Sequence, residues 1–178
     1  MTIPNLITAH QKKVTVVKLQ KSISILNQAY KLSVAEQGQP EVNDILNLDI
    51  EDYFNKYWAP FLKYSTYCNT PMDCGYKSRF FKQLDGETNP FQMTNAANFT
   101  FQTNEGFVYS IQIRGFWSGY PYFNGTVGTD GGIAIVVDLN GSKVPNTFGK
   151  DLFYLVCSNF EDKGIERAGW EIDKGYPW

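Results

Sequence analysis

The spacing of hydrophobic positions changes along this chain, from a helical period in the first part to short apolar runs in the rest. Over residues 5–36, apolar residues recur three and four positions apart, which marks one face of an α-helix. Gly38 and Pro40 then favour an end to that helix. A single long helix is predicted, with its apolar stripe on a sheet, because an isolated helix gains little stability without packing. The stripe consists of Val16, Leu19, Ile23, Leu26 and Tyr30.

A second helix is predicted over residues 49–64, and strands follow it. Asp49 is a candidate N-cap, and Pro60 should bend or break this helix. The segments after it are rich in β-branched and aromatic residues, and residues 103–106 should link two of them as a hairpin. Helices followed by strands predict a single α+β domain with an antiparallel sheet. The expected strands are residues 76–84, 98–103, 107–116, 132–139 and 151–157.

Composition and charge exclude several classes of protein. Hydrophobic residues make up 43% of the 178 residues and aromatic residues 16%, so the chain can fill a core and disorder is not expected. The net charge is −2 without a basic block, which speaks against binding of nucleic acid or of an anionic membrane surface. No apolar run approaches the roughly 18 residues that a membrane-spanning helix needs.

The cysteines indicate an oxidising compartment. Cys68 and Cys74 lie close together in the turn-rich stretch CNTPMDCG, for which a disulfide is the favoured interpretation. Two free thiols are an alternative, and a metal site is the least favoured because no second Cys or His pair stands near. Cys157, in the apolar run LFYLVC, is expected to be a buried free thiol.

The sequence contains no recognisable catalytic constellation. His10 is the only histidine, and it stands beside Lys12 and Lys13 at the expected exposed start of the long helix. A Ser/His/Asp triad, a Cys/His pair or a His-rich metal site would each depend on it, and nothing places it near a nucleophile. No two carboxylates can be assigned acid and base roles from their spacing. We therefore expect neither an enzyme nor a cofactor.

A polar stretch between the last two predicted strands has two interpretations. Asp138 and Asn140 are candidate calcium ligands, at the first and third positions of an EF-hand-type loop. Such a loop also requires Gly at its sixth position and Glu at its twelfth, where this chain has Lys143 and Gly149. Calcium is therefore kept only as the less favoured alternative.

A hairpin turn accounts for the same stretch better. Asn140 and Gly141 suit positive φ angles, and Pro145 stiffens the returning chain. Asp138 and Asn146 can accept hydrogen bonds from nearby backbone N–H groups. A structural turn is accordingly the favoured interpretation.

Three segments of the chain resemble type IV pilins and the pseudopilins of type II secretion. IPNLITAHQKKVTVVKLQKSISILNQAYKLS is similar to the part of the pilin helix that follows its membrane-embedded half, and YFNKYWAPFLK to the short helix that comes next in many minor pilins. VDLNGSKVPNTFGKDLFYL is similar to a stretch near the C-terminus of such subunits. The residues that carry this last similarity are Asp138, Asn140, Gly141, Pro145, Asn146, Gly149 and Asp151.

The resemblance implies a pilin-like fold, in which residues 5–36 are the second half of a stem helix and residues 41–178 form a globular head. It implies a structural subunit of a pilus or pseudopilus, whose partners are other such subunits and the filament assembly machinery. A prepilin leader, a methylated N-terminus and an apolar half-helix in the inner membrane would precede the stem, and we expect this part to be truncated here. The head would stand in the periplasm before assembly, and in isolation it would be monomeric. Some pseudopilins bind calcium in a loop of the sheet.

A surface-exposed adhesin or ligand-binding module is the alternative function. Trp117, Tyr120 and Tyr122 crowd a Gly-rich loop, where exposed aromatic side chains could stack on a sugar or anchor a protein partner. The same side chains could instead cap the sheet and complete the edge of the core. A secretion signal upstream would favour the adhesin, and a prepilin leader the pilin-like subunit.

Overall fold

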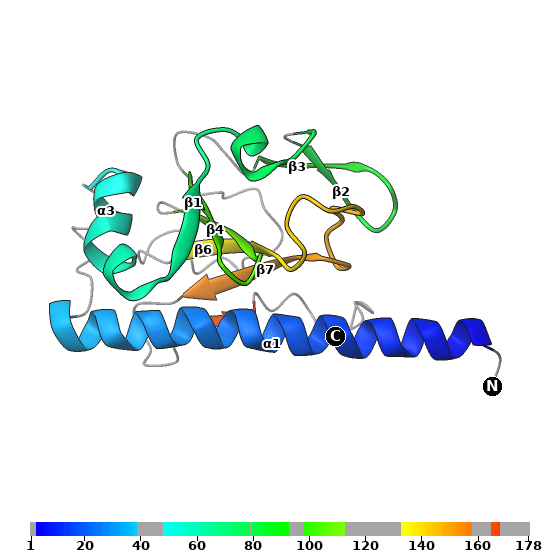
Figure 1. The fold of residues 1–178 in the computed structure, drawn as a ribbon. Helices are drawn as coiled ribbons and strands as arrows, with labels where there is room; N and C mark the ends of the chain where they lie inside the picture. The colour runs from blue at the N-terminus through cyan, green and yellow to red at the C-terminus, as the bar shows by residue number, and fades with distance from the viewer. Residues whose placement is uncertain are drawn as a thin grey trace, which may run out of the picture.

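The computed structural model describes residues 3–38, 48–78, 80–92, 98–112, 133–157 and 165–167. Its first element, helix α1 (Ile3–Gln37), lies along one side of the rest of the molecule (Figure 1). The helix ends where Gly38 takes a φ of +80° and its N–H donates to the carbonyl of Val34 at 3.0 Å. The long helix predicted over residues 5–36 is therefore confirmed.

Helix α3 (Ile50–Tyr57) is shorter than the pattern indicates. Asp49 is its N-cap, and the side chain accepts a hydrogen bond from the N–H of Asp52 at 2.9 Å. The α-helix ends at Tyr57, and a 3-10 turn (Ala59–Phe61) that contains Pro60 follows it. The predicted break at Pro60 is confirmed, because proline has no N–H to continue the helical hydrogen bonds, but the predicted end at residue 64 is wrong.

In the described part of the chain, the strands form a six-stranded antiparallel sheet in the order β1-β4-β5-β6-β7-β8, with a separate hairpin of β2 and β3. The fold is thus α+β. The predicted strand over residues 76–84 shrinks to the short β2, and β1, β3 and β8 were not predicted. The bounds are β1 (Tyr64–Tyr67), β2 (Phe80–Lys82), β3 (Thr88–Gln92), β4 (Asn98–Thr103), β5 (Val108–Gln112), β6 (Ile133–Asp138), β7 (Leu152–Cys157) and β8 (Ile165–Arg167).

The hairpin between β4 and β5 follows the sequence closely. The N–H of Thr103 donates to the carbonyl of Phe107 at 2.9 Å, and the N–H of Gly106 donates to the carbonyl of Thr103 at 2.9 Å. Gly106 has a φ of +85°, which glycine adopts without strain. The predicted link over residues 103–106 is confirmed, and residues 113–116 of the strand expected there lie outside the described residues.

The sheet is covered on both faces. On one face, side chains of α1 and α3 form a core with the sheet. In this core the ring of Phe54 stacks on that of Phe99, with the ring centroids 3.8 Å apart. On the other face, a second cluster joins the sheet to the Cys68–Cys74 segment and to β2. Neighbouring residues of β5 divide between the two, as strand geometry requires: Tyr109 belongs to the first cluster and Val108 to the second.

The apolar stripe of α1 contacts the sheet over only part of its length. Leu19 and Leu26 are buried and Ile23 is half-buried against the same core, as predicted. Val16 is 43% exposed, so its predicted place on the sheet is wrong. Every described side chain from residue 7 to residue 18 is exposed except the half-buried Thr15. The N-terminal turns of α1 extend past the end of the sheet (Figure 1), so the sheet does not cover the apolar stripe along its whole length.

Two serines complete the buried face of α1. Ser22 and Ser33 have exposed fractions of 0% and 2%. The hydroxyl of Ser22 donates to the carbonyl of Leu19 at 2.8 Å, which satisfies it within the helix. The phenol of Tyr109, on β5, donates to the carbonyl of Ser22 at 3.2 Å. The small side chain of Ser22 therefore lets the backbone of α1 approach the sheet closely enough for a direct hydrogen bond to Tyr109.

Candidate functional site

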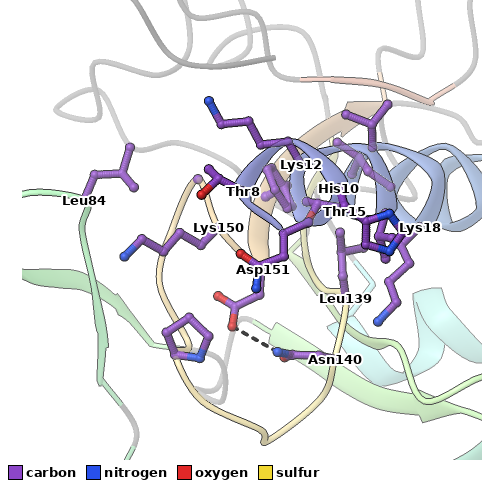
Figure 2. A pocket seen from close by; sticks show the side chains of 17 residues that line it. Thr8, His10, Lys12, Thr15, Lys18, Leu84, Leu139, Asn140, Lys150 and Asp151 are labelled. Carbon is purple, nitrogen blue, oxygen red and sulfur yellow. Dashed lines mark hydrogen bonds between the residues drawn. The ribbon is translucent and has the colours of Figure 1, made fainter. Parts of the chain in front are cut away.

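Residues 138–151, called the motif turn below, are drawn together by one carboxylate. Asp151 Oδ1 accepts a hydrogen bond from the N–H of Thr147, at 2.6 Å. Its Oδ2 accepts from the N–H of Asn146 at 2.8 Å and from Nδ2 of Asn140 at 3.2 Å (Figure 2). The backbone carbonyl of Asp151 accepts from the N–H of Leu139 at 2.9 Å. One buried residue thus fixes both sides of the turn.

A second buried carboxylate ties the turn to the disulfide segment. Asp138 has an exposed fraction of 0%, and its Oδ1 accepts a hydrogen bond from the N–H of Asn140 at 3.0 Å. Its Oδ2 accepts from the phenol of Tyr76 at 2.7 Å. No local pattern of the sequence indicates the pairing of Tyr76 with Asp138, because the two residues are 62 positions apart.

Burial dominates the protonation of these groups. It raises the pKa of Asp138 to about 7, against the lowering effect of the hydrogen bonds from Asn140 and Tyr76. Burial also raises the pKa of Asp151, although three neighbouring donors act in the opposite direction. The pKa of Tyr76 is raised too, by burial first and by the charge of Asp138 second. The Tyr76 phenol therefore remains a hydrogen-bond donor at any ordinary pH.

Glycine is required at two positions of the motif turn. Gly141 has a φ of +64°, and a Cβ there would lie 3.2 Å from the carbonyl oxygen of Gly106. Gly149 has a φ of +81°, and a Cβ there would lie 3.0 Å from Leu84 Cδ1. Asn146 also has a positive φ, of 49°, but Asn140 does not, so only the Gly141 half of the prediction for that pair is confirmed.

The donors around the two carboxylates fit a turn better than a calcium site. Both oxygens of Asp138 and both of Asp151 already accept hydrogen bonds from the protein, and calcium would have to displace these donors. Asn140 directs its amide nitrogen, not its oxygen, to Asp151. The side-chain oxygens of Asn140 and Asn146 are buried and accept no hydrogen bond, so these two atoms are the ones open to a further donor or cation. Within the described ranges, no cluster of three or more His, Cys, Asp or Glu side chains is arranged to hold a metal ion.

Cys68 and Cys74 form a disulfide, with their Cα atoms 5.6 Å apart, and both residues are buried. The loop between them closes with a 3-10 turn (Pro71–Cys74), in which Asp73 Oδ2 accepts from the N–H of Thr70 at 2.7 Å. Gly75 follows with a φ of +81° and directs the chain to Tyr76. The disulfide segment thereby holds the phenol that bonds to Asp138. The backbone of Cys157 belongs to β7, but its side chain lies outside the described residues.

A groove of about 920 Å³ separates the N-terminal half of α1 from the motif turn. We call it the helix groove. Figure 2 shows Lys12, Thr15 and Lys18 on the helix, with Asp151 and Asn140 beneath them on the turn. No pattern in the sequence indicates this groove, because its two walls are more than 100 positions apart in the chain. His10 lies in its lining and is exposed, as predicted.

The candidate ligand loop with Trp117, Tyr120 and Tyr122 lies outside the described residues. The structure therefore brings together the motif turn, the disulfide segment and α1, and leaves that loop untested. None of the helices in the described part of the chain combines the length and apolarity needed to cross a membrane.

Comparison with known proteins places the chain in a family without assigning it a role. A model described as a family of unknown function (DUF6613) matches residues 5–114, which is more than half of the 178 residues. The match covers α3, all but the first two residues of α1 and strands β1 to β5, but not the motif turn. No curated protein and no solved structure matches the chain.

Proposed function

We propose a role for the chain from its own residues, because it belongs to this family of unknown function and membership supplies none. The chain is proposed to be a structural subunit of a type IV pilus or a type II secretion pseudopilus, with a pilin-like fold and no catalysis. Its long helix would fasten the globular part to a filament. In the cell it would be anchored in the inner membrane with its globular part in the periplasm, and would then enter the filament.

The division of α1 into two halves is the observation that carries this proposal. The C-terminal half buries Leu26, Ala29 and Tyr30 in the core. The N-terminal turns extend past the sheet, and the described side chains from residue 7 to residue 18 are exposed except the half-buried Thr15. Apolar side chains among them include Ile7 and Val17, at 53% and 56% exposure. A helix that needed only to stabilise this domain would gain nothing from such an extension, whereas a filament subunit would use it to pack on its neighbours.

The motif turn supports the same proposal. The residues that resemble the pilin stretch are those that shape the turn: Asp151 and Asp138 accept its hydrogen bonds, and Gly141 and Gly149 supply its positive φ angles. The resemblance therefore concerns residues with a structural reason to be there, and not an isolated match of letters.

Processing and assembly of the full gene product test the proposal. The upstream reading frame is expected to encode a leader followed by roughly twenty apolar residues, beginning with Phe or Met and carrying an early Glu. In a cell with the matching machinery, a prepilin peptidase should shorten the protein, and mass spectrometry should detect it in purified filaments. Deletion of the gene should reduce piliation, secretion or DNA uptake.

A matched loop variant separates this role from the adhesin. Replacing Trp117 and Tyr120 by Ala should leave filament assembly intact, because neither residue belongs to the proposed packing surface. If deletion leaves filaments and secretion unchanged while this double variant abolishes binding to a glycan or a host cell, the pilin-like role is wrong and the adhesin is correct.

A further inference from the structure

The helix groove has an apolar floor. Leu139 and Phe153 line it and are buried, and Leu19 of α1 joins them. Val14 and Val16 extend this apolar surface along the helix and are partly exposed, at 41% and 43%. A partner that covers this floor with apolar side chains of its own would remove the surface from water, which favours binding.

The lysines that line the groove surround this floor with positive charge. Lys12, Lys18 and Lys150 are exposed, and no carboxylate of the described residues forms an ion pair with them. Figure 2 shows Lys18 and Lys150 extending on opposite sides of the groove. Asp151 also lines the groove, but its oxygens accept three hydrogen bonds within the motif turn. The groove therefore suits a surface that combines apolar side chains with carboxylates.

A surface of the opposite charge lies at the start of α3. Asp49, Glu51 and Asp52 are exposed there, and neither Glu51 nor Asp52 forms an ion pair with another described residue. The positive end of the helix dipole stabilises carboxylates at this position. Lys56, one turn further along α3, lies over the ring of Tyr57, 4.8 Å from its centroid. The first turn of α3 therefore presents carboxylates without a base among them.

Two tyrosines give this surface its apolar part. Tyr64 and Tyr67 stand on β1, an edge strand of the described sheet, and are 37% and 36% exposed. The ring of Tyr64 packs edge-on against that of Phe54 on α3, with the centroids 5.7 Å apart. Burial first, and the charge of Glu51 second, raise the pKa of Tyr67, so its phenol lies near that carboxylate. Tyrosine is common where proteins meet, because it offers both an apolar ring and a hydroxyl. We call this surface the acidic face; it consists of Asp49, Glu51, Asp52, Tyr64 and Tyr67.

The acidic face and the helix groove lie at different levels of α1. Helix α3 and the 3-10 turn after it pack on the C-terminal part of α1, where the ring centroids of Tyr30 and Trp58 are 6.4 Å apart. Leu19, the last residue of α1 that lines the groove, precedes Tyr30 by about 16 Å at 1.5 Å per residue. Figure 1 shows α3 beside the C-terminal end of α1, away from its N-terminal turns. Because both surfaces are fixed on one helix, the acidic face can enter the groove of another molecule but not its own.

We propose that the acidic face of one copy of this chain occupies the helix groove of a second copy. Glu51 and Asp52 face the lysines of the groove, and Tyr67 covers part of its apolar floor. The two surfaces differ, so the contact is head-to-tail, and each copy both offers a face and receives one. This contact names the neighbour that a filament subunit would bind, and in that sense it rests on the proposed function.

The contact should be weak between isolated domains. Exposed ion pairs contribute little free energy, and salt screens them. In a filament, the stems would hold neighbouring copies together and raise their effective concentration, so a weak contact suffices there. The isolated chain should therefore associate only when it is concentrated.

Amide NMR of the whole chain at rising concentration tests the contact. The resonances of residues 8–19 and 49–52 should move together between tens of micromolar and millimolar protein at low salt, and should move less at high salt. An acid variant, Glu51→Lys with Asp52→Lys, should lose this concentration dependence. A base variant, Lys12→Glu with Lys18→Glu, should lose it too, because either change sets like charges against each other across the contact.

A mixture of the two variants provides the sharper test. Their reversed charges are complementary, so an equimolar mixture should regain the shifts that neither variant shows alone. Lys21→Glu and Glu87→Lys reverse exposed charges outside both surfaces, and these control variants should respond to concentration as the unmodified chain does. Thermal melts of each variant check that the domain is folded, so that a lost shift reports the contact and not unfolding.

Two results would overturn the proposal. The first is an unmodified chain whose amide resonances do not change with concentration. The second is a mixture that behaves as the two variants do alone, because association would then not depend on these charges. Neither result touches the filament role, which deletion of the gene tests. A protein found in filaments without this contact would keep the role and lose the contact, whereas a contact in solution without any effect of deletion would do the reverse.

Discussion

A buried carboxylate has consequences that extend beyond its own hydrogen bonds. Asp138 lies at the end of β6, where its two oxygens hold the motif turn on one side and the Tyr76 phenol on the other. A pKa of about 7 means that the folded chain binds a proton at Asp138 more readily than the unfolded chain, whose ordinary value is 3.8. This difference links the protonation of one residue to the stability of the whole domain.

The contribution of Asp138 to stability should therefore fall as the pH rises. A raised folded-state pKa gives stabilisation that is complete below about pH 4 and is lost as the pH rises through about 7. The effect should be on the order of a few kcal/mol, at about 1.4 kcal/mol for each unit of pKa difference. Urea unfolding at pH 5 and pH 8 would measure it.

Two variants isolate the source of this pH dependence. Asp138→Asn should flatten it, because the amide does not titrate. Glu36→Gln removes an exposed carboxylate and is the control: the free energy of unfolding should change with pH as it does in the unmodified chain. A slope that persists in Asp138→Asn would assign the effect to another group, of which Asp151 is the first to examine because burial raises its pKa as well.

At the scale of elements, α1 has a part within the core and a part outside it. Leu26 lies at the centre of the first part, with an exposed fraction of 0%, whereas Val17 belongs to the second, at 56%. The same substitution should therefore change the free energy of unfolding by very different amounts at the two positions, although both side chains are aliphatic and lie on one helix.

Leu26→Ala should lower the free energy of unfolding by about 2–5 kcal/mol, because it removes core contacts and leaves a cavity. Leu26→Asp should cost several kcal/mol or prevent folding, since it buries a charge without a partner. Val17→Ala and Val17→Asp are the matched controls and should change stability by no more than about 0.5 kcal/mol. A thermal melt of Leu26→Asp close to that of the unmodified chain would contradict the placement of α1 on the sheet.

The disulfide is an element-scale constraint, because it closes the short loop that positions Tyr76. Alkylation of the native, oxidised protein should modify no thiol at Cys68 or Cys74, and reduction beforehand should make both reactive. Cys157 should react once the chain is unfolded, with or without reductant. Mass spectrometry of the peptides would distinguish these cases, and alkylation of all three residues without reduction would refute the pairing.

The sequence predicts elements best where local pattern alone determines them. Strands β4, β6 and β7 have runs of β-branched and aromatic residues, and their predicted bounds agree with the structure to within a residue or so. Strands β1, β3 and β8 are short, and pairing with a neighbouring strand defines them more than composition does. Val16 belongs to the helical stripe by spacing, but periodicity cannot indicate where the sheet beneath a helix ends.

At the scale of the whole molecule, the motif turn joins parts that are distant in the chain. It is hydrogen-bonded to Tyr76, which follows the Cys68–Cys74 segment, and to Lys82 of the β2–β3 hairpin. Its residue Asp151 also lines the helix groove. Its residues were predicted to form a turn, whereas these long-range contacts were not. They depend on the three-dimensional path of the chain, for which the sequence contains no periodic signal.

Removal of calcium should leave the domain unchanged, because each carboxylate oxygen of Asp138 and Asp151 already accepts a hydrogen bond from the protein. The melting temperature should be the same with excess chelator as with added calcium, within error. A cation that bound only the folded state would raise it, so a drop of several degrees on chelation, restored by calcium, would contradict this interpretation. Asn140 and Asn146 would then be the first ligands to test, since their buried side-chain oxygens accept no hydrogen bond.

The position of α1 also affects how the chain would fold as it leaves the ribosome. The helix is synthesised before the sheet, but its core partners include Phe153 and Leu155 of β7, and it packs against β8, and both strands come more than 100 residues later. Neighbouring strands from β4 to β8 are consecutive in sequence and can pair in turn as they emerge. The buried stripe around Leu26 can meet α3 and the 3-10 turn early, but its contacts with β7 and β8 form only when most of the chain has been made. Part of the apolar face of α1 is therefore exposed on the nascent chain, where a chaperone or another temporary cover would protect it.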